Sequence, residues 1–570
     1  MRILLLTHAF NSLTQRLGAE LSQRGHEISI EFDIADSVTE EAVALFRPQL
    51  IVAPYLRRAI PESVWSRNVC LIVHPGVVGD RGPSALDWAI QEGVSEWGVT
   101  VLQAEAEMDA GPIWASANFP MPLTKKSSVY RNEVTQAATA AVLQAVQRFE
   151  SGDFLPQALA TLADVQGRLR ALMKQPQRSL DWQRDDSATV LRKIRAADGF
   201  PGVADRLFDQ PCHLFDAWPE TTLRGAPGEV IARRETALLR ATVDGAVWIG
   251  HVKRPDGIKL PAALAFAAEA AALPQASLDG WWRSAAPTWQ DIAYEEAGAV
   301  GFLHFEFYNG AMSSAQCRRL QAALAWAKQR PAQVLVLMGG GDFWSNGIHL
   351  NVIESASLSG ASAADESWRN INAMNDLTLE LLTTENQITV AALAGNTGAG
   401  GCFLARAADR VWAREAVMLN PHYKNMGNLY GSEYWTYSLA RRLGEDAANA
   451  IMRERQPLTS RHARDIGLTD ACVAGDVRAF HLEVARLAGE LADPADWTAT
   501  IAAKRETRAR DEAAKPLAAY RAEELAQMRR NFYGFDPSYH VARHHFVRKS
   551  PASWTPRHLA RHRELGWVTP

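Results

Sequence analysis

Residues 70–90, CLIVHPGVVGDRGPSALDWAI, join a short apolar run to a loop rich in glycine and then to a helical pattern. Similar short apolar runs occupy residues 3–6, 27–32 and 50–53, and helical patterns separate them. Short buried strands that alternate with helices predict a parallel α/β sheet. Ligands of such sheets lie beyond the carboxyl ends of the strands, where His74 follows its apolar run.

Composition excludes several classes of protein. The chain has 570 residues with 22% charged and 47% hydrophobic side chains, which argues against a disordered or fibrous protein. Its formal net charge of −4 provides no bulk positive field for nucleic acid or an anionic membrane. We therefore expect small-molecule partners that are held at local sites.

Cysteine usage and apolar runs point to a reduced compartment. The five cysteines are odd in number and form no CxxC pair, which disfavours a disulfide framework or a thiolate zinc site. The apolar run near Met1 is too short for a signal peptide, and the Ala-rich stretch 261–273 is shorter than the ~20 residues of a membrane span. The sequence predicts a cytoplasmic protein without a membrane segment.

Two later segments repeat the strand-and-helix pattern. Residues 334–338 and 388–394 are apolar runs that end in glycine-rich loops, so a second α/β unit is expected there. Between the two α/β units, alternation within 230–251 is typical of a small barrel. The predicted organisation is a catalytic α/β domain at 1–165, a barrel subdomain at 166–273, a linker at 274–297, an α/β domain at 298–492, and a helical, basic tail at 493–570.

The segment from His74 to Ile90 resembles the H-P-S-L-L-P-x-x-R-G signature of 10-formyl-tetrahydrofolate transferases and hydrolases. Met108–Ile113 resembles the D-x-G-P-I loop of the same family. The resemblance implies that His74 and Asp109 stabilise the tetrahedral intermediate and move protons. It also implies that the folate contacts are Asn11, Ser12, Arg81 and Gly82. Without the two motifs, a histidine near a strand end and an aspartate in a turn would each be ordinary polar residues.

One position departs from this family. The family has asparagine two residues before the histidine, where this chain has Ile72. The side-chain amide that would donate to the formyl oxygen is therefore missing. A thiol, which is partly ionised near neutral pH, is a better nucleophile than an amine and would suit such a site as the acceptor.

Three segments of the second α/β unit resemble the enoyl-CoA hydratase/isomerase, or crotonase, superfamily. They are Asn309–Met312, Asp342–Leu350 and Gly395–Asp409. The resemblance implies an oxyanion hole made by the backbone N–H groups of Ile348 and Gly400, aimed at an acyl-thioester carbonyl. It implies that coenzyme A is bound near Gly340, Asn346, Gly347 and Gly401.

The carboxylates of hydratases do not carry over. Phe403 and His422 stand where that family has its two glutamates, so water addition to an enoyl thioester is not expected. The aromatic-rich segment 420–437 contains Glu433, which is the best remaining proton carrier, with Tyr423 to position it. The competing interpretations are that the aromatic residues form core and that Glu433 faces solvent at a helix N-terminus.

The combination of both resemblances along one chain is similar to the HoxX-type family of nickel–iron hydrogenase maturation proteins. It implies transfer of a formyl group from 10-formyl-tetrahydrofolate to coenzyme A and release of carbon monoxide for the hydrogenase iron. The maturation machinery of the hydrogenase large subunit would be a partner. Two alternatives remain: a formyl-tetrahydrofolate hydrolase fused to an acyl-CoA hydratase or isomerase, and a scaffold without activity. His540, His544 and His545 have no nearby acidic or cysteine partner, so no metal site is expected.

Overall fold

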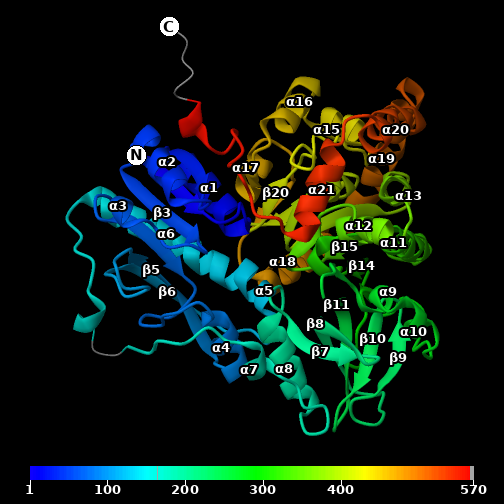
Figure 1. The fold of residues 1–570 in the computed structure, drawn as a ribbon. Coiled ribbons are helices and arrows are strands. Elements are labelled where there is room, and N and C mark those ends of the chain that lie inside the picture. Colours follow the sequence, from blue (N-terminus) through cyan, green and yellow to red (C-terminus); the bar gives the residue numbers. More distant parts are fainter. Residues whose placement is uncertain (163–164, 565–570) are drawn as a thin grey trace. The chain divides into compact units, whose positions relative to one another are not determined.

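The computed structural model describes residues 1–162 and 165–564, without the side chains of 494–496 (Figure 1). The chain divides into two compact units. Unit 1 contains residues 1–255, 261–273 and the C-terminal residues from 551, and unit 2 contains residues 256–260 and 274–550. Each unit is described by itself.

The first sheet of unit 1 has the order β2-β1-β3-β4-β5-β6. Its strands are β1 (Arg2–Thr7), β2 (Glu27–Phe32), β3 (Leu50–Tyr55), β4 (Cys70–His74), β5 (Glu96–Gln103) and β6 (Ile113–Pro120). The first four are parallel, as predicted, whereas β5 and β6 run antiparallel to their neighbours. Residues 104–112, which join β5 to β6, are fewer than the dozen or so that a parallel crossover needs.

Helices cover both faces of this sheet. They include α1 (Ser12–Gln23), α2 (Asp36–Phe46), α3 (Glu62–Trp65), α4 (Ala85–Glu92), α5 (Lys126–Val129) and α6 (Thr135–Ser151). Leu5 packs with residues of α1 and α6 on one face, and Leu4 packs with residues of α2 on the other. This alternation is the period of two that a strand buried on both sides requires.

The second sheet of unit 1 is antiparallel, with the path β7-β8-β11-β10-β9. Its strands are β7 (Val203–Leu207), β8 (Gln210–Glu220), β9 (Val230–Arg234), β10 (Ala237–Ala241) and β11 (Ala246–Lys253); β12 (Lys259–Pro261) follows in the chain. The short helices α7 (Gln175–Arg178), α9 (Ala262–Ala265) and α10 (Ala267–Ala271) accompany α8 (Ser187–Ala197). Val190 and Ile194 of α8 pack on the apolar face of the sheet.

The C-terminal segment of the chain covers the open edge of β2. The backbone N–H of Ile30 donates to the Leu559 carbonyl at 3.0 Å, and the N–H of Phe32 donates to the Thr555 hydroxyl at 2.9 Å. These contacts satisfy edge groups that would otherwise invite another strand. Residues 555–563, here called the C-terminal strap, therefore belong to unit 1, and the predicted tail of 493–570 is split between the two units.

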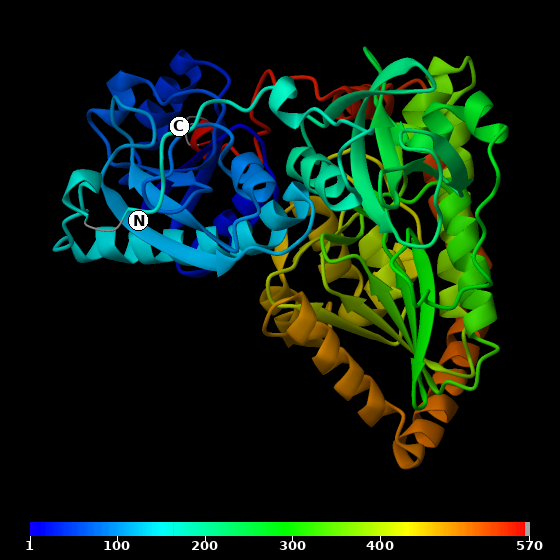
Figure 2. The same cartoon turned by 90° about the horizontal axis from the view of Figure 1, so that it is seen from below.

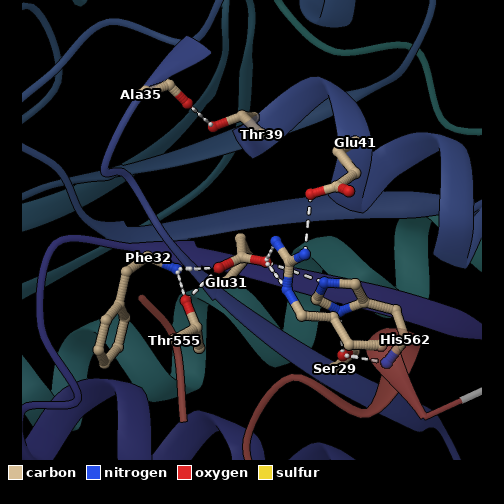
Figure 3. A network of polar contacts seen from close by, with 9 residues as sticks. Ser29, Glu31, Phe32, Ala35, Thr39, Glu41, Thr555 and His562 are labelled. Atoms are coloured by element: carbon tan, nitrogen blue, oxygen red, sulfur yellow. Dashed lines mark hydrogen bonds and ion pairs between the residues drawn. The ribbon is translucent and has the colours of Figure 1, made fainter. Parts of the chain in front are cut away.

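A buried carboxylate fixes the strap to β2 (Figure 3). Glu31 accepts from Arg563 at 2.7 Å and from His562 Nε2 at 2.9 Å, and it also accepts from the Thr555 hydroxyl. The other ring nitrogen of His562 lies 2.7 Å from the Ser29 hydroxyl. Burial alone would raise the pKa of Glu31, but these donors outweigh it and lower the pKa.

Unit 2 contains two sheets. The larger has the order β13-β14-β15-β17-β19-β22 and the smaller β16-β18-β20-β21. The strands are β13 (Ile292–Ala297), β14 (Val300–Phe305), β15 (Val334–Gly339), β16 (Phe343–Ser345), β17 (Ile388–Leu393), β18 (Asn396–Gly398), β19 (Arg410–Arg414), β20 (Met418–Asn420), β21 (Leu458–Thr459) and β22 (Ala471–Val473).

Strand β13 lies inside the stretch 274–297, which the sequence indicated as a linker. It forms a hairpin with β14, and Gly298 adopts a φ of 59° at the turn. Ile292 and Tyr294 are buried in the core of unit 2, with the Tyr294 ring 5.1 Å from that of Trp326. The apolar part of β13 is only three residues long, and the prolines and glycines around it are typical of a linker, so the sequence did not predict this strand.

The helices of unit 2 extend to residue 548. They are α11 (Ser314–Ala327), α12 (Leu350–Leu358), α13 (Ala363–Leu382), α14 (Gly400–Arg406), α15 (Trp435–Leu443), α16 (Glu445–Glu454), α17 (Ser460–Asp465), α18 (Val477–Leu491), α19 (Pro494–Ala514), α20 (Leu517–Tyr533) and α21 (Ser538–Arg548). A short turn joins α19 to α20, and the two helices diverge from it, in orange to red-orange at the bottom of Figure 2. Met528 and Phe532 of α20 are buried in the core, so this part of the predicted tail is integral to unit 2. Among the described residues, no helix has the length and apolarity needed to cross a membrane.

Candidate functional site

His74 is the last residue of β4 and lies at the carboxyl edge of the parallel strands, as predicted. Its imidazole is buried between two carboxylates. Nε2 lies 2.9 Å from Asp80 Oδ1, and Nδ1 lies 3.5 Å from Asp109 Oδ2. This cluster, with Gly82, is called the His74 site. An imidazole held in this way is oriented at both nitrogens and can exchange a proton with either carboxylate.

The loops around His74 hold the two carboxylates in place. Asp109 adopts a φ of 55°, and its Oδ2 accepts a 3.1 Å hydrogen bond from the backbone N–H of Gly82. Asp80 Oδ2 lies 3.4 Å from Arg170 Nε. A Cβ on Gly76 would lie 2.5 Å from His74 Nε2, so only glycine lets this loop approach the imidazole.

The structure brings His74, Asp109 and Gly82 together, and two of the other predicted folate contacts, Asn11 and Arg81, have protein partners. Asn11 caps α1 by accepting from Thr14 N, and its amide donates to Tyr130 OH at 3.3 Å. Ser12 is the first residue of α1. Arg81 forms an ion pair with Glu107. These positions remain proposals for folate binding.

Asp80 is a member of the His74 site that the sequence did not single out. It stands within the glycine-rich loop GVVGDRG, where an acidic residue is usually assigned to a turn. Burial shows that Asp80 is more than a turn residue, because a carboxylate with almost no exposure must be paired. Only the folded chain shows that its partners are His74 and Arg170.

In unit 2, Glu433 lies in the loop that precedes α15 and is buried. Glu433 and Tyr434 are consecutive residues with positive φ, 59° and 57°. Glu433 Oε2 lies 2.5 Å from the Tyr423 hydroxyl. Glu433 Oε1 has no hydrogen-bond partner in the described part of the chain, and it lies 2.3 Å from where a Cβ on Gly400 would be. The free oxygen therefore faces the glycine at the start of α14.

The predicted oxyanion-hole residues are neighbours in space. A Cβ on Gly347, the residue before Ile348, would lie 3.2 Å from Gly400 N. Neither the Ile348 nor the Gly400 amide has an acceptor within the described residues, and Gly400 begins α14, so its N–H points out of the helix. Two unpartnered amides beside an unpartnered carboxyl oxygen form what is here called the Glu433 site. The resemblance to crotonases aims such amides at a thioester carbonyl oxygen.

The protonation of Glu433 is set mainly by burial. Burial raises the pKa of Glu433 to about 8, against the opposing effect of the hydrogen bond from Tyr423. The Tyr423 hydroxyl lies 3.0 Å from the Ser432 carbonyl as well as 2.5 Å from Glu433. Its single proton cannot satisfy both acceptors. When Glu433 is ionised, Tyr423 donates to its Oε2, and this hydrogen bond opposes the effect of burial on the pKa of Glu433.

The other predicted positions of unit 2 surround this site. Phe403, at the first hydratase-carboxylate position, stacks on Tyr423 with ring centroids 5.3 Å apart. Asn346 donates to the Asn309 carbonyl at 2.8 Å and so fixes the loop before Gly347. Two further predicted coenzyme A contacts are glycines: Gly340 follows β15, and Gly401 lies in the first turn of α14. His422, at the second hydratase position, is buried after β20.

Two polar residues near Glu433 were absent from the sequence-based prediction. Asn375 Oδ1 of α13 accepts from the backbone N–H of Glu433 at 2.8 Å. Glu524 of α20 accepts from the loop on either side of Glu433. Both lie in long amphipathic helices, where a polar residue is usually solvent-facing. No local sequence signal marks them as buried.

Within the described ranges, no group of three or more histidine, cysteine, aspartate or glutamate side chains is placed to hold a metal ion. His540 contacts Arg543 through Nδ1 and the Phe532 carbonyl through Nε2. His544 Nδ1 lies 2.9 Å from Glu354. These histidines have structural contacts between α21 and its neighbours.

Three family models match the chain: Formyl transferase over residues 31–146, Formyl transferase, C-terminal domain over 172–269, and Enoyl-CoA hydratase/isomerase over 306–557. The predicted fold class is confirmed by these matches together with the α/β architecture. A methionyl-tRNA formyltransferase of Ralstonia nicotianae is 26% identical over 228 residues, which are 39% of this chain and 68% of that protein.

Two proteins resemble the chain along its length. HypX from Aquifex aeolicus, solved in complex with tetrahydrofolic acid, is 45% identical, with a TM-score of 0.95 and 100% of both chains covered. The hydrogenase maturation factor HoxX of Bradyrhizobium diazoefficiens is 54% identical over 565 residues, which cover 99% of this chain and 97% of that protein. This similarity across both units shows that the chain belongs to the HoxX family of hydrogenase maturation factors.

Proposed function

We propose that the chain moves a formyl group from 10-formyl-tetrahydrofolate to coenzyme A at the His74 site and releases carbon monoxide from formyl-CoA at the Glu433 site. The carbon monoxide would become a ligand of the nickel–iron hydrogenase centre. The observation that carries the proposal is the Glu433 carboxyl, whose unpartnered oxygen faces Gly400 beside two free amides. The relative solved with tetrahydrofolic acid supports a folate at the formyltransferase domain.

At the His74 site, the proposed step is attack of the coenzyme A thiolate on the formyl carbon. The bond from sulfur to carbon forms, and the bond from carbon to the folate nitrogen then breaks. His74 gives the departing nitrogen a proton, and the carboxylates of Asp80 and Asp109 stabilise the imidazolium before that transfer. Ile72 supplies no amide donor, which fits an acceptor that attacks without strong polarisation of the formyl group.

At the Glu433 site, formyl-CoA splits into carbon monoxide and free thiol. The Glu433 carboxylate takes the proton from the formyl carbon, the carbon–sulfur bond breaks, and the thiolate leaves. Glu433 then passes the proton to sulfur, so the reaction neither consumes nor releases a proton. Burial raises the pKa of Glu433 to about 8 and makes its carboxylate a stronger base than an exposed one. Tyr423 holds the other carboxyl oxygen and so points the free one at the reacting group.

Hydration of an enoyl thioester is the alternative chemistry of a crotonase fold. It needs two carboxylates that position one water molecule. Phe403 stacks its ring on Tyr423 at one of these positions, and His422 holds the other. The wall of the site is therefore aromatic, with Glu433 as the acid nearest to Gly400. One acid that faces Gly400 suits transfer of one proton within a substrate.

The test is carbon monoxide release from supplied formyl-CoA, detected by the absorbance of the carbonmonoxy form of an added haem protein. Glu433→Gln removes the base while keeping the side-chain shape, so the rate should fall by at least about a hundredfold. Glu445→Gln, at an exposed glutamate of α16, is the matched control and should match the unsubstituted protein. A Glu433→Gln protein as fast as this control would refute the assignment.

A further inference from the structure

Helix α20 presents one face to the loop that carries Glu433. Three acceptors on this helix, four and three residues apart, each receive a hydrogen bond from a backbone amide of that loop. Asn531 Oδ1 accepts from Tyr430 N at 3.0 Å, Met528 Sδ accepts from Gly431 N at 3.2 Å, and Glu524 Oε2 accepts from Tyr434 N at 2.9 Å. This spacing places Glu524, Met528 and Asn531 on one side of the helix. The loop is thus held along its length by a helix that the sequence suggested was outside the domain.

Glu524 makes the most contacts in this row. Besides Tyr434 N, it accepts from the backbone N–H of Thr436 at 2.9 Å, from the Thr436 hydroxyl at 2.6 Å and from the Ser432 hydroxyl at 3.3 Å. Its side chain is fully buried. The donors flank Glu433 on both sides, at 432 and at 434–436.

The held loop is strained. Glu433 and Tyr434 both have positive φ, which non-glycine residues rarely adopt in succession. Such a conformation persists only where surrounding contacts fix it. Asn375 Oδ1 fixes the Glu433 amide from one side, and Glu524 fixes Tyr434 and Thr436 from the other. The backbone conformation of this loop directs the Glu433 carboxyl toward Gly400.

We propose that Glu524 is a positioning residue for the carbon monoxide-forming step: it clamps residues 432–436 so that the Glu433 carboxyl faces Gly400 and the two free amides. The inference rests on the proposed function of the Glu433 site and deepens it. Glu524 acts through Glu433 and does not itself touch the reacting group.

Glu524 also places a second acid next to Glu433. Burial raises the pKa of Glu524 to about 7, and its charge contributes to the raised pKa of Glu433. Among the described residues, the other titratable groups that interact with these two carboxyls are Tyr423, Tyr430 and Tyr434 of the loop, Cys317 of α11, and Lys515 just before α20; Arg521 of α20 interacts with Tyr434. Loss of the Glu524 carboxylate should therefore let Glu433 ionise at lower pH.

The experiment measures carbon monoxide release from formyl-CoA against pH for the full chain and three variants. Glu524→Gln keeps the side-chain shape but loses the charge and one acceptor oxygen. Thr436→Val removes only the hydroxyl donor and leaves the Glu524 charge in place. Glu523→Gln is the control, because Glu523 is exposed and pairs with Lys515 at 2.7 Å.

For Glu524→Gln we expect kcat to fall roughly ten- to a hundredfold, as for a misplaced reacting group, with the KM for formyl-CoA nearly unchanged. The midpoint of its pH profile should move to lower pH, because the Glu524 charge raises the pKa of Glu433. Thr436→Val should lower kcat less and leave the midpoint in place. Glu523→Gln should match the unsubstituted protein in both quantities.

Two results would overturn the inference. One is a kcat and midpoint for both Glu524→Gln and Thr436→Val that equal those of the control. The other is a loss of rate that equals the loss of folded protein measured by circular dichroism, while the midpoint of the pH profile stays unchanged. That result would show that Glu524 has only a structural role. If the unsubstituted chain releases no carbon monoxide from formyl-CoA, the proposed function itself fails, which is a distinct outcome.

Discussion

At the scale of single residues, the two sites use buried acids in different ways. In the His74 site, Asp80 and Asp109 flank an imidazole that can carry positive charge. In the Glu433 site, no cationic side chain of the described residues contacts the carboxyl, and burial raises its pKa to about 8. The first arrangement favours an ion pair during transfer, and the second favours a carboxyl that accepts and returns a proton.

His74 should separate the two half-reactions. His74→Ala removes the group that protonates the leaving folate nitrogen, so carbon monoxide made from 10-formyl-tetrahydrofolate and coenzyme A should fall by about a hundredfold or more. Carbon monoxide made from supplied formyl-CoA should be unaffected, because Glu433 belongs to the other unit. The haem-protein absorbance assay measures both. Equal losses from both substrates would contradict the division of labour.

Tyr423 should tune the pH dependence. Because the proposed mechanism requires the base form of Glu433, the rate from formyl-CoA should rise as pH increases through about 8 in the unsubstituted protein. The Tyr423 hydrogen bond lowers the pKa of Glu433, so Tyr423→Phe should move the midpoint to higher pH. The measurement is the pH profile of kcat. A midpoint that moves down, or a rate that falls with rising pH, would refute Glu433 as the base.

At the scale of elements, the sequence predicted residues that belong to recognisable motifs, but it did not predict their buried polar partners. His74 and Asp109 were predicted from residue patterns in loops after strands, and Glu433 and Tyr423 from an aromatic-rich segment; the structure places each pair in contact, and their roles stay predictions. Asp80, Asn375 and Glu524 could not, since each has the local sequence of a turn or a solvent-facing helix and acquires its partner only on folding. Strand β13 was expected to be part of a linker because prolines and glycines surround it, although its partner β14 follows directly in the chain. Helix α20 was expected in a tail outside the domain because the loop that it contacts is remote in the chain.

The C-terminal strap should be a stabilising element of unit 1. His562→Ala removes one donor from the buried Glu31 carboxylate, so unfolding of unit 1 should become easier by about 1–3 kcal/mol at neutral pH. Arg561→Ala, at an exposed neighbour on the same turn, is the control. Urea unfolding followed by tryptophan fluorescence measures the difference.

The stabilisation of unit 1 by the contact between His562 and Glu31 should decrease as the pH falls. The donors around Glu31 lower its pKa in the folded state below the ordinary 4.5. A lowered folded-state pKa stabilises the protein above the unfolded value and loses this effect as pH falls through the folded value. The difference between His562→Ala and the control should therefore be present at neutral pH and shrink below about pH 4. A difference that grows on acidification would contradict the pairing.

At the scale of the whole molecule, the chain combines a formyltransferase domain with an enoyl-CoA hydratase/isomerase domain. In the proposed function, formyl-CoA would be the product of the first domain and the substrate of the second. Similarity to HoxX and HypX across both units fits selection for the combination rather than for either domain alone. The hydrogenase maturation machinery would then be the consumer of the gas.

The most direct test supplies the purified chain with 10-formyl-tetrahydrofolate, labelled with ¹³C in the formyl group, and with coenzyme A. The account predicts ¹³C-labelled carbon monoxide in an amount equal to the tetrahydrofolate formed, and none when coenzyme A is left out. Labelled formate as the sole one-carbon product, with or without coenzyme A, would contradict it.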